Sequence, residues 1–146
     1  PNFYTPKEIK NKSLEEFTST ELFSNEQFSS SDIIENNKFT LVNIWSSWCV
    51  PCRLEHSALM DLSEKTDLNI VGLNYKDKKN NAIKFLNELG NPFSKILTDP
   101  DGIVSISLGA YGVPETFLLN NKSKIIRKYI GPLTKENILE IIKIIK

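Results

Sequence analysis

The sequence predicts an α/β domain in which a central mixed β-sheet is flanked by helices, and two patterns carry this prediction. Strand-like apolar runs at residues 39–45 and 68–75 are each followed by a run with helical spacing, the order that produces right-handed parallel crossovers. Later strand-like runs at residues 116–119 and 124–130 are joined by an Asn-Asn-Lys turn at 120–122, so these two strands are expected to pair antiparallel.

Length and composition limit the possible functions. The chain has 146 residues, enough for one domain with a hydrophobic core, and its 40% hydrophobic and 25% charged residues are ordinary for a globular protein. The formal net charge is zero and no dense basic block occurs, so nothing supports nucleic-acid binding. No run of about 18 apolar residues is present, so no membrane-spanning helix is expected.

The N-terminal end is expected to be a polar tail. Residues 1–12 include two prolines and show no periodicity, so we expect a linker there and a single domain over residues 13–146. Because the chain begins with Pro1 rather than methionine, we expect that a signal peptide or membrane anchor has been removed.

The other elements follow in order along the chain. Residues 17–23 alternate loosely between apolar and polar and suggest an edge strand or hairpin, and the polar residues 30–32 suggest the cap of a short helix. The run at 39–45 is interpreted as a buried strand, and the helix after it is expected to end near residues 66–67. A turn at 99–102 precedes a short apolar segment.

Apolar spacing indicates three amphipathic helices. In the first, two neighbouring rows recur at helical spacing: Leu54, Ala58 and Leu62, and Cys52, Glu55, Leu59 and Leu62. The second is marked by Ala82, Phe85, Leu86 and Leu89 and closes at Gly90. In the last, which Thr134 is expected to cap, the inward residues are predicted to be Ile138, Leu139, Ile142 and Ile145, with Glu140 and Lys143 toward solvent.

Both cysteines lie at the junction between the first of these strands and its helix. Cys49 and Cys52 are separated by Val50 and Pro51, a spacing that is typical of a redox-active dithiol. The first turn of a helix carries unpaired backbone N–H groups and partial positive charge, which stabilise a thiolate. We therefore expect Cys49, at the helix start, to be the nucleophile and Cys52, three residues later, to resolve the mixed disulfide.

Three alternative roles for the cysteine pair fit the sequence less well. A zinc site needs about four ligands, and two cysteines with the single histidine, His56, are one short, so no metal is expected. A purely structural disulfide would close a very short loop and gain little chain entropy. Two inert core thiols would not account for their position between a strand and a helix.

Five blocks of the chain resemble one family. They are residues 42–56 (VNIWSSWCVPCRLEH), 72–77 (GLNYKD), 89–93 (LGNPF), 111–118 (YGVPETFL) and 131–133 (GPL). In this order they are similar to the cytochrome c maturation thioredoxins, the CcmG/DsbE family, over roughly residues 38–146. The resemblance implies a thioredoxin fold, here with an N-terminal extension and an extra strand–helix unit.

The resemblance also implies an activity and partners. Members of the family are periplasmic thiol–disulfide oxidoreductases, usually tethered to the inner membrane by an N-terminal anchor. A membrane electron donor of the CcdA/DsbD type keeps them reduced. They reduce the haem-binding disulfide of apocytochrome c, or its mixed disulfide with a CcmH-like partner. We expect the same here, from a monomer that needs no cofactor.

The same resemblance assigns site residues beyond the redox disulfide of the two cysteines. Pro114 is expected to be a cis proline beside the disulfide, and Glu55 and Glu115 are expected to be acidic residues near it. The backbone of Val113 would pair with an extended substrate, and Trp48 would form part of the substrate surface. The alternatives are an ordinary helix glutamate for Glu55 and a solvated strand-end acid for Glu115.

The position of Asn43 sharpens the expectation for Glu55. Thioredoxins proper have a buried aspartate six residues before the first cysteine, where this chain has Asn43, which cannot take a proton from Cys52. Glu55 lies three residues beyond Cys52 on the same helix face, and burial there would raise its pKa and let it exchange protons with the thiol. His56, seven residues after Cys49, is expected to be a surface or partly packed histidine rather than a partner of the nucleophile.

Three other functions compete with this one. A general extracytoplasmic thioredoxin-like reductase of the ResA/TlpA kind would act on other protein substrates. A redox-silent binding module can dispense with its cysteines, so the intact pair of Cys49 and Cys52 disfavours that function. A peroxiredoxin needs a Thr and Arg cradle around its reactive cysteine, and the Cys49-x-x-Cys52 motif does not fit that arrangement. The dithiol motif serves oxidants and reductants alike, so the motif alone does not set the direction of electron flow.

Overall fold

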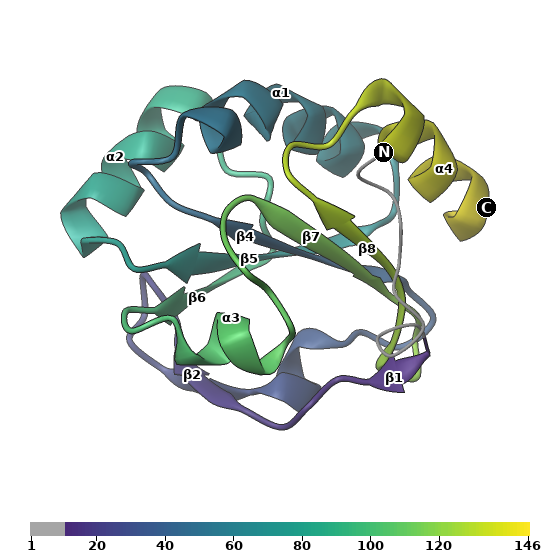
Figure 1. Cartoon of the computed structure of the whole chain (residues 1–146), viewed down its shortest axis with the longest axis horizontal. Coiled ribbons are helices and arrows are strands. Elements are labelled where there is room, and N and C mark those ends of the chain that lie inside the picture. Colours follow the sequence, from purple (N-terminus) through teal and green to yellow (C-terminus); the bar gives the residue numbers. More distant parts are fainter. Residues whose placement is uncertain (1–10) are drawn as a thin grey trace.

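The computed structural model describes residues 11–146, and a mixed β-sheet forms its centre (Figure 1). The strands are β1 (Lys12–Ser13), β2 (Thr18–Thr20), β3 (Gln27–Ser29), β4 (Thr40–Trp45), β5 (Asn69–Tyr75), β6 (Lys95–Asp99), β7 (Glu115–Leu119) and β8 (Lys124–Ile130). The helices are a 3₁₀ turn η1 (Ser30–Ile33), α1 (Val50–Lys65), α2 (Lys79–Leu89), α3 (Ile103–Ser107) and α4 (Lys135–Ile145). Helices α1, α2 and α4 cover one face of the sheet, and α3 lies on the other face with the β2–β3 hairpin (Figure 1).

The sheet has the strand order β1–β8–β7–β4–β5–β6. β4 pairs parallel with β5, and β5 pairs parallel with β6, so α1 and α2 are the two crossover helices and the predicted parallel crossovers are confirmed. β7 pairs antiparallel with both β4 and β8, which confirms the predicted final hairpin.

β6 is a strand that the sequence patterns do not predict. Its burial does not alternate, and only two adjacent apolar residues, Ile96 and Leu97, are buried in it. Its strand conformation therefore depends on pairing with β5 rather than on a local pattern. The β2–β3 hairpin, which agrees with the expected hairpin near residues 17–23, lies against this edge through the bridge between Glu21 and Leu97.

Helix faces agree with the prediction only in part. On α1 the row of Cys52, Glu55, Leu59 and Leu62 is buried, whereas Leu54 is exposed. On α4 the prediction for Leu139 is wrong, because this side chain is exposed and Ile141 is buried in its place. Positions 138, 141, 142 and 145 have the i, i+3, i+4, i+7 spacing of a single face, and position 139 lies outside it. Glu140 is also half-buried, since it accepts a hydrogen bond from the Tyr129 hydroxyl.

The described part of the expected N-terminal tail is tied to the sheet. The Asn11 backbone N–H donates to the Ile125 carbonyl, and Lys12 and Ser13 pair with β8 as strand β1. Ordered structure therefore begins before residue 13, and the rest of the expected tail, residues 1–10, lies outside the described residues. Within residues 11–146 no helix has the length and apolar character needed to cross a bilayer.

The strands place opposite side chains in two cores. Leu41 and Trp45 of β4 pack with α1 and α2, while Val42 and Ile44 pack in the core on the other face of the sheet. Asn43 shares the face of Leu41 and Trp45, so this buried amide points toward α1. The end of β4 thus leads directly into the two cysteines, with a polar side chain beneath the helix that carries them.

Candidate active site

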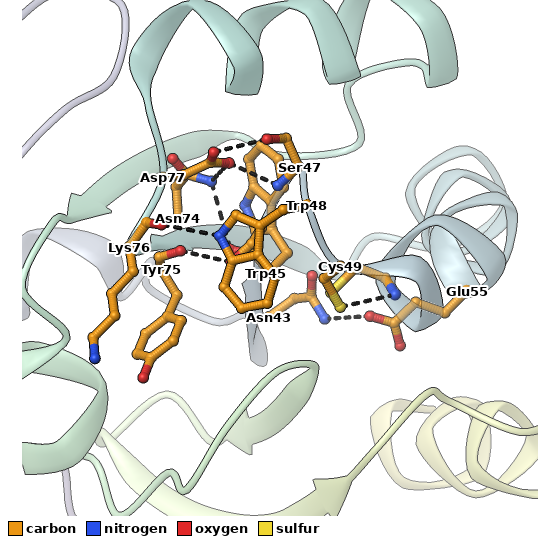
Figure 2. Close-up of a disulfide and its surroundings, with 12 residues drawn as sticks. Asn43, Trp45, Ser47, Trp48, Cys49, Glu55, Asn74, Tyr75, Lys76 and Asp77 are labelled. Carbon is orange, nitrogen blue, oxygen red and sulfur yellow. Dashed lines mark hydrogen bonds between the residues drawn. A yellow bond between two sulfur atoms is a disulfide. The ribbon is translucent and has the colours of Figure 1, made fainter.

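Cys49 and Cys52 form a disulfide at the N-terminus of α1 (Figure 2). Cys49 is the N-cap residue, and its Sγ accepts a hydrogen bond from the Cys52 backbone N–H at 3.2 Å. After reduction the same N–H and the positive end of the helix dipole would face a Cys49 thiolate. Both cysteines are buried, but Cys49 is bordered by the exposed side chains of Trp48 and Val50. A substrate disulfide can therefore reach the pair from the Cys49 side.

Asp77 holds the loop that leads from β4 to Cys49 (Figure 2). Its carboxylate accepts hydrogen bonds from the Ser47 backbone N–H at 2.6 Å, the Ser47 hydroxyl at 2.7 Å and the Asn74 amide at 3.0 Å. The indole Nε1–H of Trp48 donates to the Lys76 carbonyl at 2.9 Å. The exposed Trp48 ring is thus fixed beside the nucleophile. No role for Asp77 was predicted, although an acid just after a strand end is a signal for such a bond.

Glu55 is buried behind the disulfide, one turn beyond Cys52 on the same face of α1. Its Oε2 accepts from the Asn43 amide at 2.9 Å, and its Oε1 accepts from the Leu133 backbone N–H at 2.9 Å. Burial raises the pKa of Glu55 from 4.5 to about 7, although the two hydrogen bonds oppose this effect. The predicted burial is therefore confirmed, and the direction of the pKa shift agrees with the prediction.

The Val113–Pro114 peptide bond is cis, as predicted. Glu115, the next residue, is buried rather than solvated. Its Oε2 accepts hydrogen bonds from the backbone N–H groups of Tyr111 and Gly112, at 2.7 and 2.9 Å. Glu115 therefore shapes the loop that leads to Val113.

The cation beside Glu115 is Lys128 of β8, which is also fully buried. Its Nζ lies 3.3 Å from Oε1 of Glu115 and donates to the Gly109 carbonyl at 2.7 Å. Sequence reasoning missed Lys128, and β8 gives no signal that singles it out, because the strand also contains Lys124 and Arg127. The two charges join β7 and β8 to the loop at residues 109–112.

The prediction of a surface or partly packed His56 is wrong, because the side chain is only 2% exposed. Its Nε2 lies 2.8 Å from the Gly90 carbonyl, which requires the tautomer with a proton on that nitrogen. The ring packs edge-on against Phe85 and Phe93. Burial lowers the pKa of His56. The segment after α2 covers this side of α1, a tertiary contact that helical spacing alone does not reveal.

Comparison with known proteins adds to this geometry. Residues 9–142 match the model of the Redoxin family. The chain belongs to the Redoxin family. As in the expected thioredoxin fold, its cysteines follow a central strand, and a cis proline comes directly before β7.

Two curated relatives are thiol:disulfide interchange proteins. The chain is 48% identical to CycY of Rhizobium leguminosarum bv. viciae over 103 residues, which cover 70% of this chain and 55% of that protein. It is 45% identical to DsbE of Escherichia coli strain K12 over 96 residues, which cover 66% of this chain and 51% of that protein. The chain thus spans about half the length of the curated relatives it matches.

Solved structures share the fold of this Redoxin-family chain. A putative DsbE from Chlorobium tepidum superposes with a TM-score of 0.79 at 22% identity, covering 92% of this chain and 94% of that one. A DsbF homologue from Corynebacterium diphtheriae superposes with a TM-score of 0.81 at 24% identity, covering 99% of this chain and 94% of that one. Together with the disulfide between Cys49 and Cys52, the comparisons support thiol–disulfide exchange at this site.

Proposed function

We propose that the protein is a periplasmic thiol–disulfide oxidoreductase that reduces the haem-binding disulfide of apocytochrome c, or its mixed disulfide with a CcmH-like partner, during cytochrome c maturation. The disulfide between Cys49 and Cys52 at a helix N-terminus carries the chemistry of this proposal. The similarity to DsbE and CycY proteins supports its finer part.

The reaction transfers two electrons from the dithiol to the substrate. The Cys49 thiolate attacks one sulfur of the substrate disulfide, a mixed disulfide forms, and the second substrate sulfur leaves as a thiolate. Cys52 then loses its proton and attacks the Cys49 sulfur, which releases the first substrate sulfur and closes the Cys49–Cys52 disulfide. The two protons of the dithiol balance the two thiols formed on the substrate.

Glu55 is the group that exchanges a proton with Cys52 in this scheme. It follows Cys52 by one turn on the buried face of α1, and with a pKa of about 7 it populates both its acid and its base form near neutral pH. Asn43 donates to the carboxylate and so orients it. Asn43 itself has no proton to give up at this pH, and it therefore positions Glu55 without replacing it.

The substrate would lie across the loop before Pro114. The Val113 backbone would pair with an extended chain, and the exposed Trp48 ring, fixed by its bond to the Lys76 carbonyl, would contact the residues around the substrate cysteines. Glu115 supports this loop from below through its bonds to Tyr111 and Gly112. In this role Glu115 is a positioning residue.

The oxidised protein needs an electron donor after each turnover. We assign that role to a membrane protein of the CcdA/DsbD type, and we place the domain, as a monomer, on the periplasmic side of the inner membrane behind an N-terminal anchor. These assignments follow the resemblance to the CcmG/DsbE family.

The test compares the reduced protein on three disulfides. One is an oxidised apocytochrome peptide containing Cys-x-x-Cys-His, the second is the same peptide with His replaced by Ala, and the third is insulin. We expect the haem-binding peptide to react at least about tenfold faster than insulin, which corresponds to about 1.4 kcal/mol of differential binding. Equal rate constants, or faster reduction of insulin, would contradict the dedicated role and favour a general reductase of the ResA/TlpA kind.

A further inference from the structure

A hollow of about 300 Å³ opens between the end of β5, helix α3 and the loop before Val113. Its wall consists of Tyr75, Ser105, Ile106 and residues 109–112. None of these residues is charged. Ile106 is 67% exposed and Tyr111 is 88% exposed, so two large apolar side chains stand at the surface of the hollow. Isolated exposed side chains are common, but two that line one concavity indicate a contact surface.

The hollow lies close to the proposed substrate side of the dithiol. The ring of Tyr75 lies 6.4 Å from the ring of Trp48, which borders Cys49. On the other side, Gly112 precedes Val113, whose backbone is the proposed pairing edge for the substrate. A chain that pairs with Val113 while its disulfide lies at Cys49 must therefore pass beside the hollow.

One wall of the hollow is held by the buried charges of Glu115 and Lys128. Glu115 accepts from the backbone N–H groups of Tyr111 and Gly112, and Lys128 donates to the Gly109 carbonyl. The Lys128 ammonium also lies 4.6 Å from the centre of the Tyr111 ring. The loop is thus fixed before a ligand arrives, which lowers the entropy lost on binding. The lining contains no acidic side chain, so a lysine or arginine would lose hydration in the hollow without gaining an ion pair.

We propose that this hollow binds one apolar side chain of the polypeptide substrate close to its disulfide, and that Ile106 and Tyr111 determine this preference. The proposal rests on the thiol–disulfide exchange proposed above, but not on a haem-binding substrate. It names a recognition element that any substrate chain with a suitably placed leucine or aromatic residue would use.

A leucine scan tests the proposal. A peptide with one internal disulfide carries serine at the three positions on either side of its cysteines, and leucine replaces each serine in turn. We expect leucine at one position to raise kcat/KM by about tenfold, mainly through KM. The variants Ile106→Ser and Tyr111→Ala are expected to lose this gain, measured in each variant as the ratio of its kcat/KM on the leucine peptide to that on the all-serine peptide. Lysine at the same position is expected to give no gain.

Ile103 supplies the matched control. It lies on the same short helix as Ile106 and is 64% exposed, but it does not line the hollow. Ile103→Ser is therefore expected to keep the leucine gain. The proposal is overturned if no leucine position exceeds serine by twofold, if the gain survives in both Ile106→Ser and Tyr111→Ala, or if Ile103→Ser removes it equally. If leucine raises the rate while the haem-binding peptide and insulin are reduced at equal rates, the hollow's role in binding an apolar side chain is supported. Only the proposal of a dedicated apocytochrome substrate is then contradicted.

Discussion

Replacing Glu55 by glutamine is expected to remove a pH-dependent penalty on folding. In the folded protein burial raises the pKa of Glu55 from 4.5 to about 7, whereas in the unfolded chain the carboxyl titrates near 4.5. The folded state therefore holds more protons between these pH values, so stability falls as pH rises from 4.5 to about 7 and the penalty is complete above that. The difference of about 2.5 between the two pKa values corresponds to roughly 3 kcal/mol.

The surroundings of Glu55 can accept a glutamine. Its side-chain oxygen can keep the bond from the Leu133 backbone N–H, and its amide would then face Asn43. Within residues 11–146 the Asn43 Oδ1 is buried and accepts no hydrogen bond, so a rotated Asn43 amide would offer this oxygen to the new donor. The rotation ends the bond that Asn43 Nδ2 now donates to the Thr116 hydroxyl, but this hydroxyl can donate to the rotated Oδ1 instead, so the variant should fold and differ mainly in charge.

Urea unfolding of the oxidised protein from pH 4 to 8 measures the effect, because the disulfide-bonded cysteines do not titrate. The free energy of unfolding of Glu55→Gln minus that of wild type should rise by roughly 3 kcal/mol across this range. Glu64→Gln, on the exposed side of the same helix, is the control and should give a nearly constant difference. A constant difference for Glu55→Gln as well would refute the assignment of a desolvated carboxyl behind Cys52.

Three further predictions concern other parts of the site. Limiting iodoacetamide should label Cys49 before Cys52 in the reduced protein, because Cys49 caps α1, and preferential adducts on Cys52 in a peptide map would reverse the assigned roles. The single histidine, His56, should titrate below pH 6.5 in a proton NMR series because burial lowers its pKa. The unfolded chain then binds this proton more readily than the folded protein, so the folded protein loses stability as pH falls below 6.5. A titration midpoint above 6.5 would contradict the burial of His56. Asp77→Asn should lower the free energy of unfolding by about 1–3 kcal/mol, since the amide cannot replace all of the carboxylate's bonds. Asp61→Asn, at an exposed ion pair, should change it by less than about 0.5 kcal/mol. Equal effects of the two substitutions in urea unfolding would show that Asp77 does not hold the loop before Cys49.

Local patterns predicted the parts of the fold that local physics controls. The crossovers, the final hairpin and the start of α1 at Cys49 follow from apolar periodicity and capping, and the structure confirms them. β6 was not predicted because its two buried apolar residues form no pattern and its pairing partner is distant in sequence. The exposed Leu139 shows a second limit, since a strongly apolar helix offers several candidate faces and only packing on the sheet selects one.

The candidate site divides in the same way. Cys49, Cys52 and Glu55 were found because strand, cap and helix spacing fix their relation within a short segment. The burial of His56 depends on Gly90, which lies 34 residues further along the chain, so no local pattern could indicate it. Glu115 and Lys128 lie on the two strands of the predicted hairpin, but their pairing beside the loop at residues 109–112 depends on the tertiary placement of that loop. The sequence of β8 also contains Lys124 and Arg127, so only the structure identifies Lys128 as the buried cation that bonds to the Gly109 carbonyl.

The most direct test of the proposed chemistry is to trap the mixed disulfide. Reduced Cys52→Ser protein is mixed with the oxidised Cys-x-x-Cys-His peptide, quenched with acid and mapped by mass spectrometry, with Cys49→Ser as the matched control. The account predicts a stable one-to-one peptide adduct on Cys49 in Cys52→Ser and none in Cys49→Ser, because only Cys49 attacks and only Cys52 resolves. An adduct on Cys52 in Cys49→Ser, with none on Cys49 in the other variant, would contradict it.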